Sequence, residues 1–269
     1  MQMQYTTLNN GIQMPLLGFG TYGVNRVDTL LAAIDCGYRL FDTAQMYGNE
    51  KEVGIAIREA ITKRGIKREE FFITTKLSSN MSFEGAKKGI ESSLKALDLG
   101  YIDLLLIHEP YAQAKDMYRA MQEAYKEGKI KALGISSFTP KVFSEFMKSC
   151  EVLPAVNQCE THIYYQQRAL IEAMKPYKTI LESWSPFVAG KSGFFDNPIL
   201  VQIAQKYNKN VAQVALRFLV QQGIVAIPKA SNPKHMQENI AIFDFSLSVA
   251  DMKAIRSLDT NKTQFSWGY

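Results

Sequence analysis

The chain has 269 residues, of which 46% are hydrophobic, and 31 basic against 26 acidic residues give it a formal net charge of +5. This composition excludes a disordered chain and a disulfide-stabilised mini-protein, and the length fits one α/β barrel or two smaller domains. The charge excess is too small for a nucleic-acid-binding surface. The three cysteines are Cys36, Cys150 and Cys159, and they are too dispersed for a disulfide framework or a zinc cluster.

Eight short apolar runs recur along the chain and are predicted to be strands. Most are continuously apolar rather than alternating, which is typical of parallel strands that are buried on both faces. In chain order the predicted strands span 16–20, 38–42, 71–76, 102–108, 130–136, 153–158, 179–185 and 224–229.

The gaps between these runs carry apolar residues at helical spacing. One such pattern begins at Val27 and stops at Gly37, a predicted C-terminal cap, and another follows Ser82, a predicted N-cap. Further amphipathic segments, also predicted to be helices, lie near 50–64, 115–127, 139–149, 165–176, 198–221 and 232–241.

The alternation of strands and helices without a flexible linker predicts a (β/α)8 barrel, an α/β TIM barrel that forms a single domain over residues 1–269. Ahead of the barrel, Asn10-Gly11 stands between two short β-like pieces and predicts a hairpin. Residues 1–15 would then form a hairpin flap over the barrel floor, and residues 259–269 remain as a short C-terminal tail.

A doubly wound sheet is the alternative fold. Residues 18–23 read GFGTYG and match the GxGxxG pattern of dinucleotide-binding sheets, and Asp42 follows at the distance of a ribose-binding acid. A lone GxGxxG is weak evidence, and this interpretation leaves the later strands without a second domain. The barrel is therefore the favoured prediction.

In a (β/α)8 barrel, catalytic residues lie at the C-terminal ends of the strands and in the loops that follow. Asp42, Lys76 and His108 end three successive predicted strands, and Tyr47 lies in the loop after the first. Taken singly, Asp42 could cap a helix and Lys76 could be a solvated strand end. Together they would face one mouth, where an unpaired buried charge is costly. Other notable residues at the strand ends are Ser136, Asn157, Gln158, Trp184, Ser185 and Lys229.

These four side chains suit the transfer of a proton to a carbonyl oxygen while a hydride arrives at the carbon. A tyrosine hydroxyl has a pKa of about 10, and a neighbouring lysine ammonium is expected to lower the pKa of Tyr47. Asp42 would keep Lys76 charged and oriented, and a histidine can position the substrate oxygen. The sequence contains no GxSxG nucleophile motif. No metal site is expected from three scattered histidines, His108, His162 and His235.

The segment 37–50, GYRLFDTAQMYGNE, resembles the first signature of the aldo-keto reductase superfamily. Lys76 after FFITT and His108 in LLLIHEP stand where that family keeps its other catalytic residues. The segments 135–138, 156–158 and 227–229 resemble its cofactor-binding motifs, so the resemblance runs over nearly the whole chain, from about Leu16 to Leu258. The chain resembles bacterial members of the diketogluconate reductase or glyoxal reductase type, and the resemblance implies a (β/α)8 barrel that reduces carbonyl groups with NADPH.

The resemblance also implies roles for individual residues. Tyr47 would be the general acid in reduction and the base in oxidation, Lys76 and Asp42 would tune it, and His108 would orient the carbonyl. The residues implied to line the substrate pocket are Tyr22, Tyr47, His108 and Glu109. The residues implied to bind NADP(H) are Gly20, Thr21, Tyr22, Asp42, Ser136, Asn157, Gln158, Trp184, Ser185, Phe187, Ala212, Lys229, Ser231, Asn232, His235, Glu238 and Asn239.

The resemblance also implies which part of the cofactor each of these residues would contact. The nicotinamide carboxamide would be held by Ser136, Asn157 and Gln158, with Trp184 stacked on the ring. The pyrophosphate loop would contribute Ser185 and Phe187. The adenosine end would be held by Lys229, Ser231, Asn232, His235, Glu238 and Asn239, with Ala212 alongside.

The sequence departs from the family pattern at four positions. Ala230 replaces a Ser or Thr, and His235 replaces the arginine that pairs with the 2′-phosphate. Because a mostly neutral imidazole cannot make that bidentate contact, we expect a weaker preference for NADPH than is usual, with some use of NADH. Ser137 replaces an Asn, which puts its carboxamide contact in doubt, and Glu109 replaces a pocket tryptophan. The short tail predicts an open pocket with broad selectivity.

Two alternative functions share features with this sequence. A short-chain dehydrogenase would need YxxxK, which matches at Tyr47–Lys51 and Tyr125–Lys129, but no glycine-rich TGxxxGxG precedes either match. A channel-associated or redox-sensing subunit with slow turnover is the alternative from another class, although no segment resembles an added partner-binding region. The expected partner is a small carbonyl substrate. With no apolar leader or membrane span, we expect a cytoplasmic monomer that binds neither membrane nor nucleic acid.

Overall fold

The computed structural model describes residues 3–265 and contains a barrel of parallel strands. The sheet order is β10-β9-β8-β7-β6-β5-β4-β3, so each strand lies beside its neighbours in the chain. The bounds are β3 (Phe19–Gly20), β4 (Leu40–Asp42), β5 (Phe72–Leu77), β6 (Ile102–Ile107), β7 (Ile130–Ser136), β8 (Val156–Glu160), β9 (Ile180–Trp184) and β10 (Val225–Ala226).

The two ends of this sheet meet and close the barrel. Leu17, just before β3, forms a parallel bridge with Ala226 of β10. Ala226 accepts a hydrogen bond from the Gly18 amide at 2.8 Å, and its own amide donates to the Leu16 carbonyl at 3.0 Å. The predicted (β/α)8 barrel is therefore confirmed.

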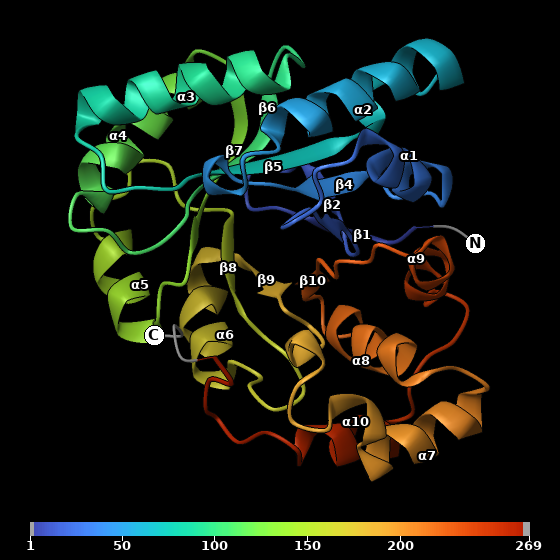
Figure 1. Cartoon of the computed structure of the whole chain (residues 1–269). Coiled ribbons are helices and arrows are strands. Elements are labelled where there is room, and N and C mark those ends of the chain that lie inside the picture. The colour runs from blue at the N-terminus through green and yellow to red at the C-terminus, as the bar shows by residue number, and fades with distance from the viewer. Residues whose placement is uncertain (1–2, 266–269) are drawn as a thin grey trace.

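Helices surround the strands (Figure 1). The α-helices are α1 (Val27–Asp35), α2 (Glu50–Arg64), α3 (Phe83–Leu97), α4 (Ala114–Lys126), α5 (Pro140–Met147), α6 (Arg168–Met174), α7 (Pro198–Tyr207), α8 (Val211–Val220), α9 (Pro233–Ile240) and α10 (Val249–Arg256). Short 3₁₀ turns add η1 (Gln45–Tyr47), η2 (Arg68–Glu70), η3 (Lys175–Tyr177), η4 (Val188–Gly190) and η5 (Phe194–Asp196).

One helix prediction was wrong in its continuity. The segment 198–221 forms two helices, α7 and α8, because Asn208 adopts a left-handed φ of 52° that ends α7. Asn210 then starts α8 with a capping box, in which its side chain accepts from the Gln213 amide while the Gln213 side chain accepts from the Asn210 amide. In addition, α10 was not predicted as a separate helix.

The N-terminal hairpin is present and lies at the floor of the barrel. Strands β1 (Tyr5–Thr7) and β2 (Gln13–Pro15) pair antiparallel. Asn10 Nδ2 donates to the Lys131 carbonyl at 2.9 Å, and Asn9 Nδ2 donates to the Pro154 carbonyl at 3.1 Å. These carbonyls stand at the starts of β7 and β8, so the hairpin covers the end of the barrel opposite the predicted mouth.

The GxGxxG segment is explained by packing at the barrel seam. A Cβ on Gly18 would lie 2.0 Å from Leu40 Cδ2, and a Cβ on Gly20 would lie 2.7 Å from the Ile227 carbonyl oxygen. Only glycine allows such an approach between neighbouring strands. Residues 18–23 therefore do not form the phosphate turn of a doubly wound sheet. Within residues 3–265, no helix is long and apolar enough to cross a bilayer.

Candidate active site

The strand order brings the four predicted catalytic residues to one mouth. Asp42 is the last residue of β4, Lys76 is next to last in β5, and His108 directly follows β6. These three strands are neighbours in the sheet, so their C-terminal ends lie side by side. Tyr47 ends the short turn η1 between β4 and α2.

Lys76 is completely buried and is the centre of the cluster. Its Nζ lies 2.6 Å from Asp42 Oδ1, 2.9 Å from the Thr43 carbonyl oxygen and 3.3 Å from Tyr47 Oη. An ammonium has three hydrogens to donate, and three acceptors are in reach. This satisfies a charge that would otherwise be too costly to bury.

Burial and the neighbouring charges together set the acid–base balance of the cluster. Burial would lower the pKa of Lys76, but the charges of Asp42 and Tyr47 and the hydrogen bond to Asp42 outweigh it, and the pKa is raised. Burial also raises the pKa of Tyr47, and Asp42 raises it further, while Lys76 acts in the opposite direction. Lys76 therefore acts on the Tyr47 pKa in the predicted direction, but the loss of water around the hydroxyl outweighs it and the net pKa is raised.

His108 stands beside Tyr47 as a neutral imidazole. The two rings meet edge to face with centroids 5.8 Å apart. Burial, and after it the Lys76 charge, lowers the pKa of His108 to about 3. His108 Nδ1 lies 2.8 Å from Ser78 Oγ, which leaves the Nε2 side of the ring for a substrate. Ser78 was not predicted, and a serine two residues beyond Lys76 carries no sequence signal that would reveal this contact.

Gln158 links Asp42 to a second buried acid. Its Nε2 donates to Asp42 Oδ2 at 2.7 Å and to Glu182 Oε2 at 2.8 Å. Glu182 lies in β9 and is completely buried. The sequence analysis did not predict Glu182, which lies inside its strand and not at the end, although an acid within an otherwise apolar strand is a visible signal.

Asn157 does not share this location. Successive side chains of a strand point to opposite faces, so Asn157 faces away from the barrel interior that Gln158 enters. Its Nδ2 donates to the Phe138 carbonyl at 2.9 Å, and its Oδ1 accepts from Cys159 Sγ. These contacts hold the turn after β7, and the contact of Asn157 with the carboxamide stays a prediction.

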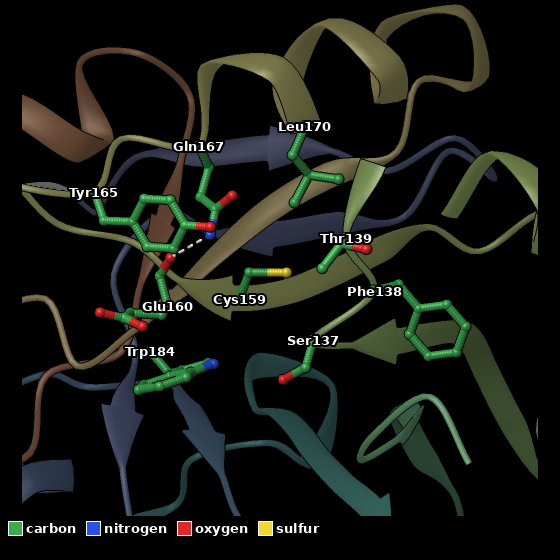
Figure 2. Close-up of a pocket in the computed structure, with 9 residues that line it drawn as sticks. All are labelled: Ser137, Phe138, Thr139, Cys159, Glu160, Tyr165, Gln167, Leu170 and Trp184. Carbon is green, nitrogen blue, oxygen red and sulfur yellow. Dashed lines mark hydrogen bonds between the residues drawn. The ribbon is translucent and has the colours of Figure 1, made fainter. Parts of the chain in front are cut away.

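A pocket opens at the ends of β7, β8 and β9 (Figure 2). Ser137 and Trp184 stand at one side of it, and Gln167 and Leu170 at the other. Ser136, at the end of β7, is buried and pairs in register with Gln158. Ser137 has a left-handed φ of 65°, a conformation that an asparagine adopts more readily than a serine.

The mouth near β3 carries exposed apolar side chains. Tyr22 is 68% exposed, and its ring packs edge to face on Tyr47 with centroids 5.1 Å apart. Met46 is 61% exposed, and Glu109 directly follows His108 and is half-buried. Thr21 is buried, with its hydroxyl donating to the Asp42 carbonyl at 2.9 Å, so it supports the backbone of β4.

The predicted adenosine-binding residues surround the start of α9. Lys229, Ser231, Asn232 and His235 are exposed, whereas Ala230 is buried. The Asn232 side chain accepts from the Lys234 amide at 2.9 Å and caps the helix. The remaining members are half-buried or buried, at Glu238 and Asn239 in α9 and at Ala212 in the first turn of α8.

The loop after β9 and the tail meet beside Trp184. Ser185 has a left-handed φ of 54°, and Phe187 packs on Phe194. The tail is described as far as Phe265, whose ring lies 5.4 Å from that of Trp184. Residues 266–269 of the predicted tail lie outside the described residues.

Comparisons with known proteins show the family to which the chain belongs. The sequence model of the Aldo/keto reductase family matches residues 17–260. The chain is 42% identical over 261 residues to the glyoxal reductase of Bacillus subtilis, covering 95% of this chain and 92% of that protein. It is 40% identical over 263 residues to the 9,11-endoperoxide prostaglandin H2 reductase of Trypanosoma cruzi, with 95% and 92% covered. A crystal structure of a Bombyx mori aldo-keto reductase in complex with NADP is similar with a TM-score of 0.91 and 31% identity, covering 98% of this chain and 95% of that chain.

Proposed function

The chain belongs to the aldo/keto reductase family, and we propose that it is an oxidoreductase that reduces aldehydes and ketones to alcohols with NADPH. The observation that carries the proposal is the buried contact of Lys76 with both Asp42 and Tyr47. A hydroxyl held this close to a permanent ammonium can lose its proton without leaving an uncompensated negative charge.

The residues around the mouth fit a dinucleotide cofactor. Within residues 3–265, Gln158 Oε1 accepts no hydrogen bond and is free to meet the carboxamide amine. Trp184 is half-buried and offers an aromatic surface for the nicotinamide ring, and Lys229 and Lys234 are exposed where the phosphates would lie. When bound, the reduced cofactor supplies the hydride. The other predicted contacts remain predictions, at Gly20, Thr21, Tyr22, Asp42, Ser136, Ser185, Phe187, Ala212, Ser231, Asn232, His235, Glu238 and Asn239.

The chain's own residues then perform the proton transfer. Tyr47 Oη donates its proton to the carbonyl oxygen as the carbon gains hydride, so the C=O becomes a CH–OH and Tyr47 becomes a phenolate. Lys76 stabilises that phenolate, and Asp42 keeps Lys76 in place. When the Ser78 hydroxyl donates to Nδ1 of His108, the neutral ring carries its hydrogen on Nε2. It can then donate a hydrogen bond from Nε2 to the carbonyl oxygen.

The substrate class we propose is small aldehydes, α-dicarbonyls or keto-sugars. The similarity to a glyoxal reductase supports the α-dicarbonyls. The mouth combines exposed aromatic and apolar side chains, Tyr22 and Met46, with the acidic Glu109. This mixture accommodates compact polar carbonyl compounds better than long apolar ones.

The test is a panel of these carbonyl substrates assayed by the loss of NADPH absorbance in a stopped-flow instrument. We expect multiple turnovers with at least one reactive small aldehyde or α-dicarbonyl. Bound NADPH without turnover of any member would contradict the proposal and favour a redox-sensing role.

The choice between cofactors is a separate prediction. His235 is exposed in the first turn of α9, and an imidazole cannot make the bidentate phosphate contact that a guanidinium makes. Lys229 and Lys234 still favour a 2′-phosphate. We therefore expect kcat/KM to favour NADPH over NADH only modestly. A preference of several thousandfold, which corresponds to about 5 kcal/mol, would refute this expectation.

A further inference from the structure

Glu182 is a buried carboxyl group to which the mechanism above assigns no task. It is completely buried in β9, two residues before Trp184, and its side chain enters the barrel interior. Burying a carboxyl group is costly unless it is hydrogen-bonded. Among the described residues, Oε2 accepts from Gln158 and Oε1 has no partner. A buried carboxyl group with an unpaired oxygen beside an active site calls for a functional explanation.

The geometry of Gln158 supplies that explanation. A side-chain amide nitrogen carries two hydrogens, and its oxygen accepts. Here one nitrogen donates to two carboxyl groups, Asp42 on β4 and Glu182 on β9, at 2.7 and 2.8 Å. Both hydrogens are therefore engaged. If the amide flipped, its oxygen would face the two carboxyl oxygens that now accept these hydrogens, Asp42 Oδ2 and Glu182 Oε2.

The protonation state of Glu182 is compatible with this arrangement. Burial, and after it the negative charge of Asp42, raises the pKa of Glu182 to about 8, while the bond from Gln158 and the Lys76 charge lower it. The neighbouring strands contribute neutral residues beside it, Gln158 on β8 and Val225 on β10. A protonated Glu182 keeps Oε2 as the acceptor for Gln158, since the free Oε1 can carry the proton.

We propose that Glu182 is a positioning residue for cofactor recognition, which holds one amide hydrogen of Gln158 while Asp42 holds the other, so that Gln158 always presents its oxygen to the carboxamide amine. The inference rests on the proposed function, because Gln158 is a cofactor residue only in an NADP(H)-dependent enzyme. Its consequence is selectivity for a carboxamide that can donate a hydrogen bond.

The test compares the dissociation constants of NADP+ and its 3-acetylpyridine analogue, in which a methyl group replaces the carboxamide amine, by titration calorimetry. In the wild-type protein NADP+ should bind about tenfold more tightly, since one hydrogen bond to a buried acceptor is worth about 1.4 kcal/mol. Gln158→Met gives the ratio without the acceptor, which should be close to one.

The variants at Glu182 separate positioning from packing. Glu182→Met and Glu182→Leu remove the acceptor while keeping similar volume, and the ratio should fall to within about twofold of the Gln158→Met value. Glu182→Gln still accepts from Gln158 and should retain the wild-type ratio. Glu50→Gln is the matched control, because Glu50 is another buried acid but binds Thr75 outside the barrel interior.

The outcomes are distinguishable. An unchanged ratio in a folded apolar variant would show that Asp42 alone orients Gln158 and would overturn the inference, as would a wild-type ratio near one. Failure of the wild-type protein to bind NADP+ at all would instead overturn the proposed function. Circular dichroism identifies which of the two apolar variants retains the fold.

Discussion

At the scale of single residues, Tyr47 is the group whose chemistry can be isolated most cleanly. Its hydroxyl is one of three acceptors around Lys76 Nζ, and its ring packs between Tyr22 and His108. Removing only the oxygen leaves those ring contacts in place. The catalytic and binding contributions of this side chain are therefore separable by one substitution.

Tyr47→Phe should lower kcat for carbonyl reduction by about 10² to 10⁴-fold, because the proton donor is lost. The dissociation constant for NADPH should stay within about twofold of the wild-type value. Steady-state kinetics and a binding titration measure the two effects. A variant that kept near-wild-type kcat would show that another group donates the proton.

The pH dependence of the reaction follows from His108 at the same scale. An unperturbed imidazole has a pKa of about 6.5, but here burial and Lys76 lower it to about 3. His108 is therefore neutral above that value, and Tyr47, with its raised pKa, stays protonated through the neutral range.

We expect kcat for reduction to show no histidine-dependent loss between pH 5 and 7, measured with saturating NADPH and substrate. A clear titration near pH 6.5 in the wild-type protein would mean that His108 is solvated.

Ser78→Ala removes the partner of His108 Nδ1 and should raise KM more than it lowers kcat, since the ring loses its orientation.

At the scale of secondary-structure elements, the contact of α2 with α3 depends on one glycine. A Cβ on Gly54 of α2 would lie 2.0 Å from the carbonyl oxygen of Leu97, the last residue of α3. The backbone cannot yield as a flexible side chain would. Gly85, in the first turn of α3, offers a comparison, because a Cβ there meets only ordinary contacts from 3.4 Å.

Gly54→Ala should destabilise the protein by about 1–3 kcal/mol through overpacking. Gly85→Ala should instead be neutral or stabilise it by up to about 1 kcal/mol, because alanine is the better helix former. Urea unfolding with a common slope compares the two. Equal effects would show that helix propensity, and not the approach of α2 to α3, governs Gly54.

At the scale of the whole molecule, the barrel closes through contacts between the two ends of the sheet. The bridge of Leu17 with Ala226 joins residues far apart in the sequence, and no strand pair can be lost without opening the ring. We propose that the chain forms one domain and unfolds as one unit.

Unfolding should therefore give coincident transitions in circular dichroism and tryptophan fluorescence. NADPH at about 100 times its dissociation constant should stabilise the folded state by about 2.7 kcal/mol and raise the midpoint. Two separate transitions, one of them insensitive to NADPH, would contradict a single domain.

The number and order of the strands, and the barrel they form, could be predicted from the sequence, because buried parallel strands and amphipathic helices leave local periodic patterns. The sequence also predicted that Asp42, Lys76 and His108 lie at one mouth with Tyr47 from the loop after Asp42, since polar residues at the ends of apolar strands are visible in one dimension. The division of 198–221 into α7 and α8 was less visible, because it depends on the backbone conformation of Asn208 and the cap formed by Asn210.

The contacts between side chains of different strands became visible in the folded chain alone. The fold joined Gln158 to Asp42 and Glu182, placed Ser78 against His108, and turned Asn157 out of the barrel interior. It also set the net pKa of Tyr47, which burial raises although Lys76 lowers it. These outcomes depend on distances between different strands and on the exclusion of water, and neither quantity is encoded in local sequence periodicity.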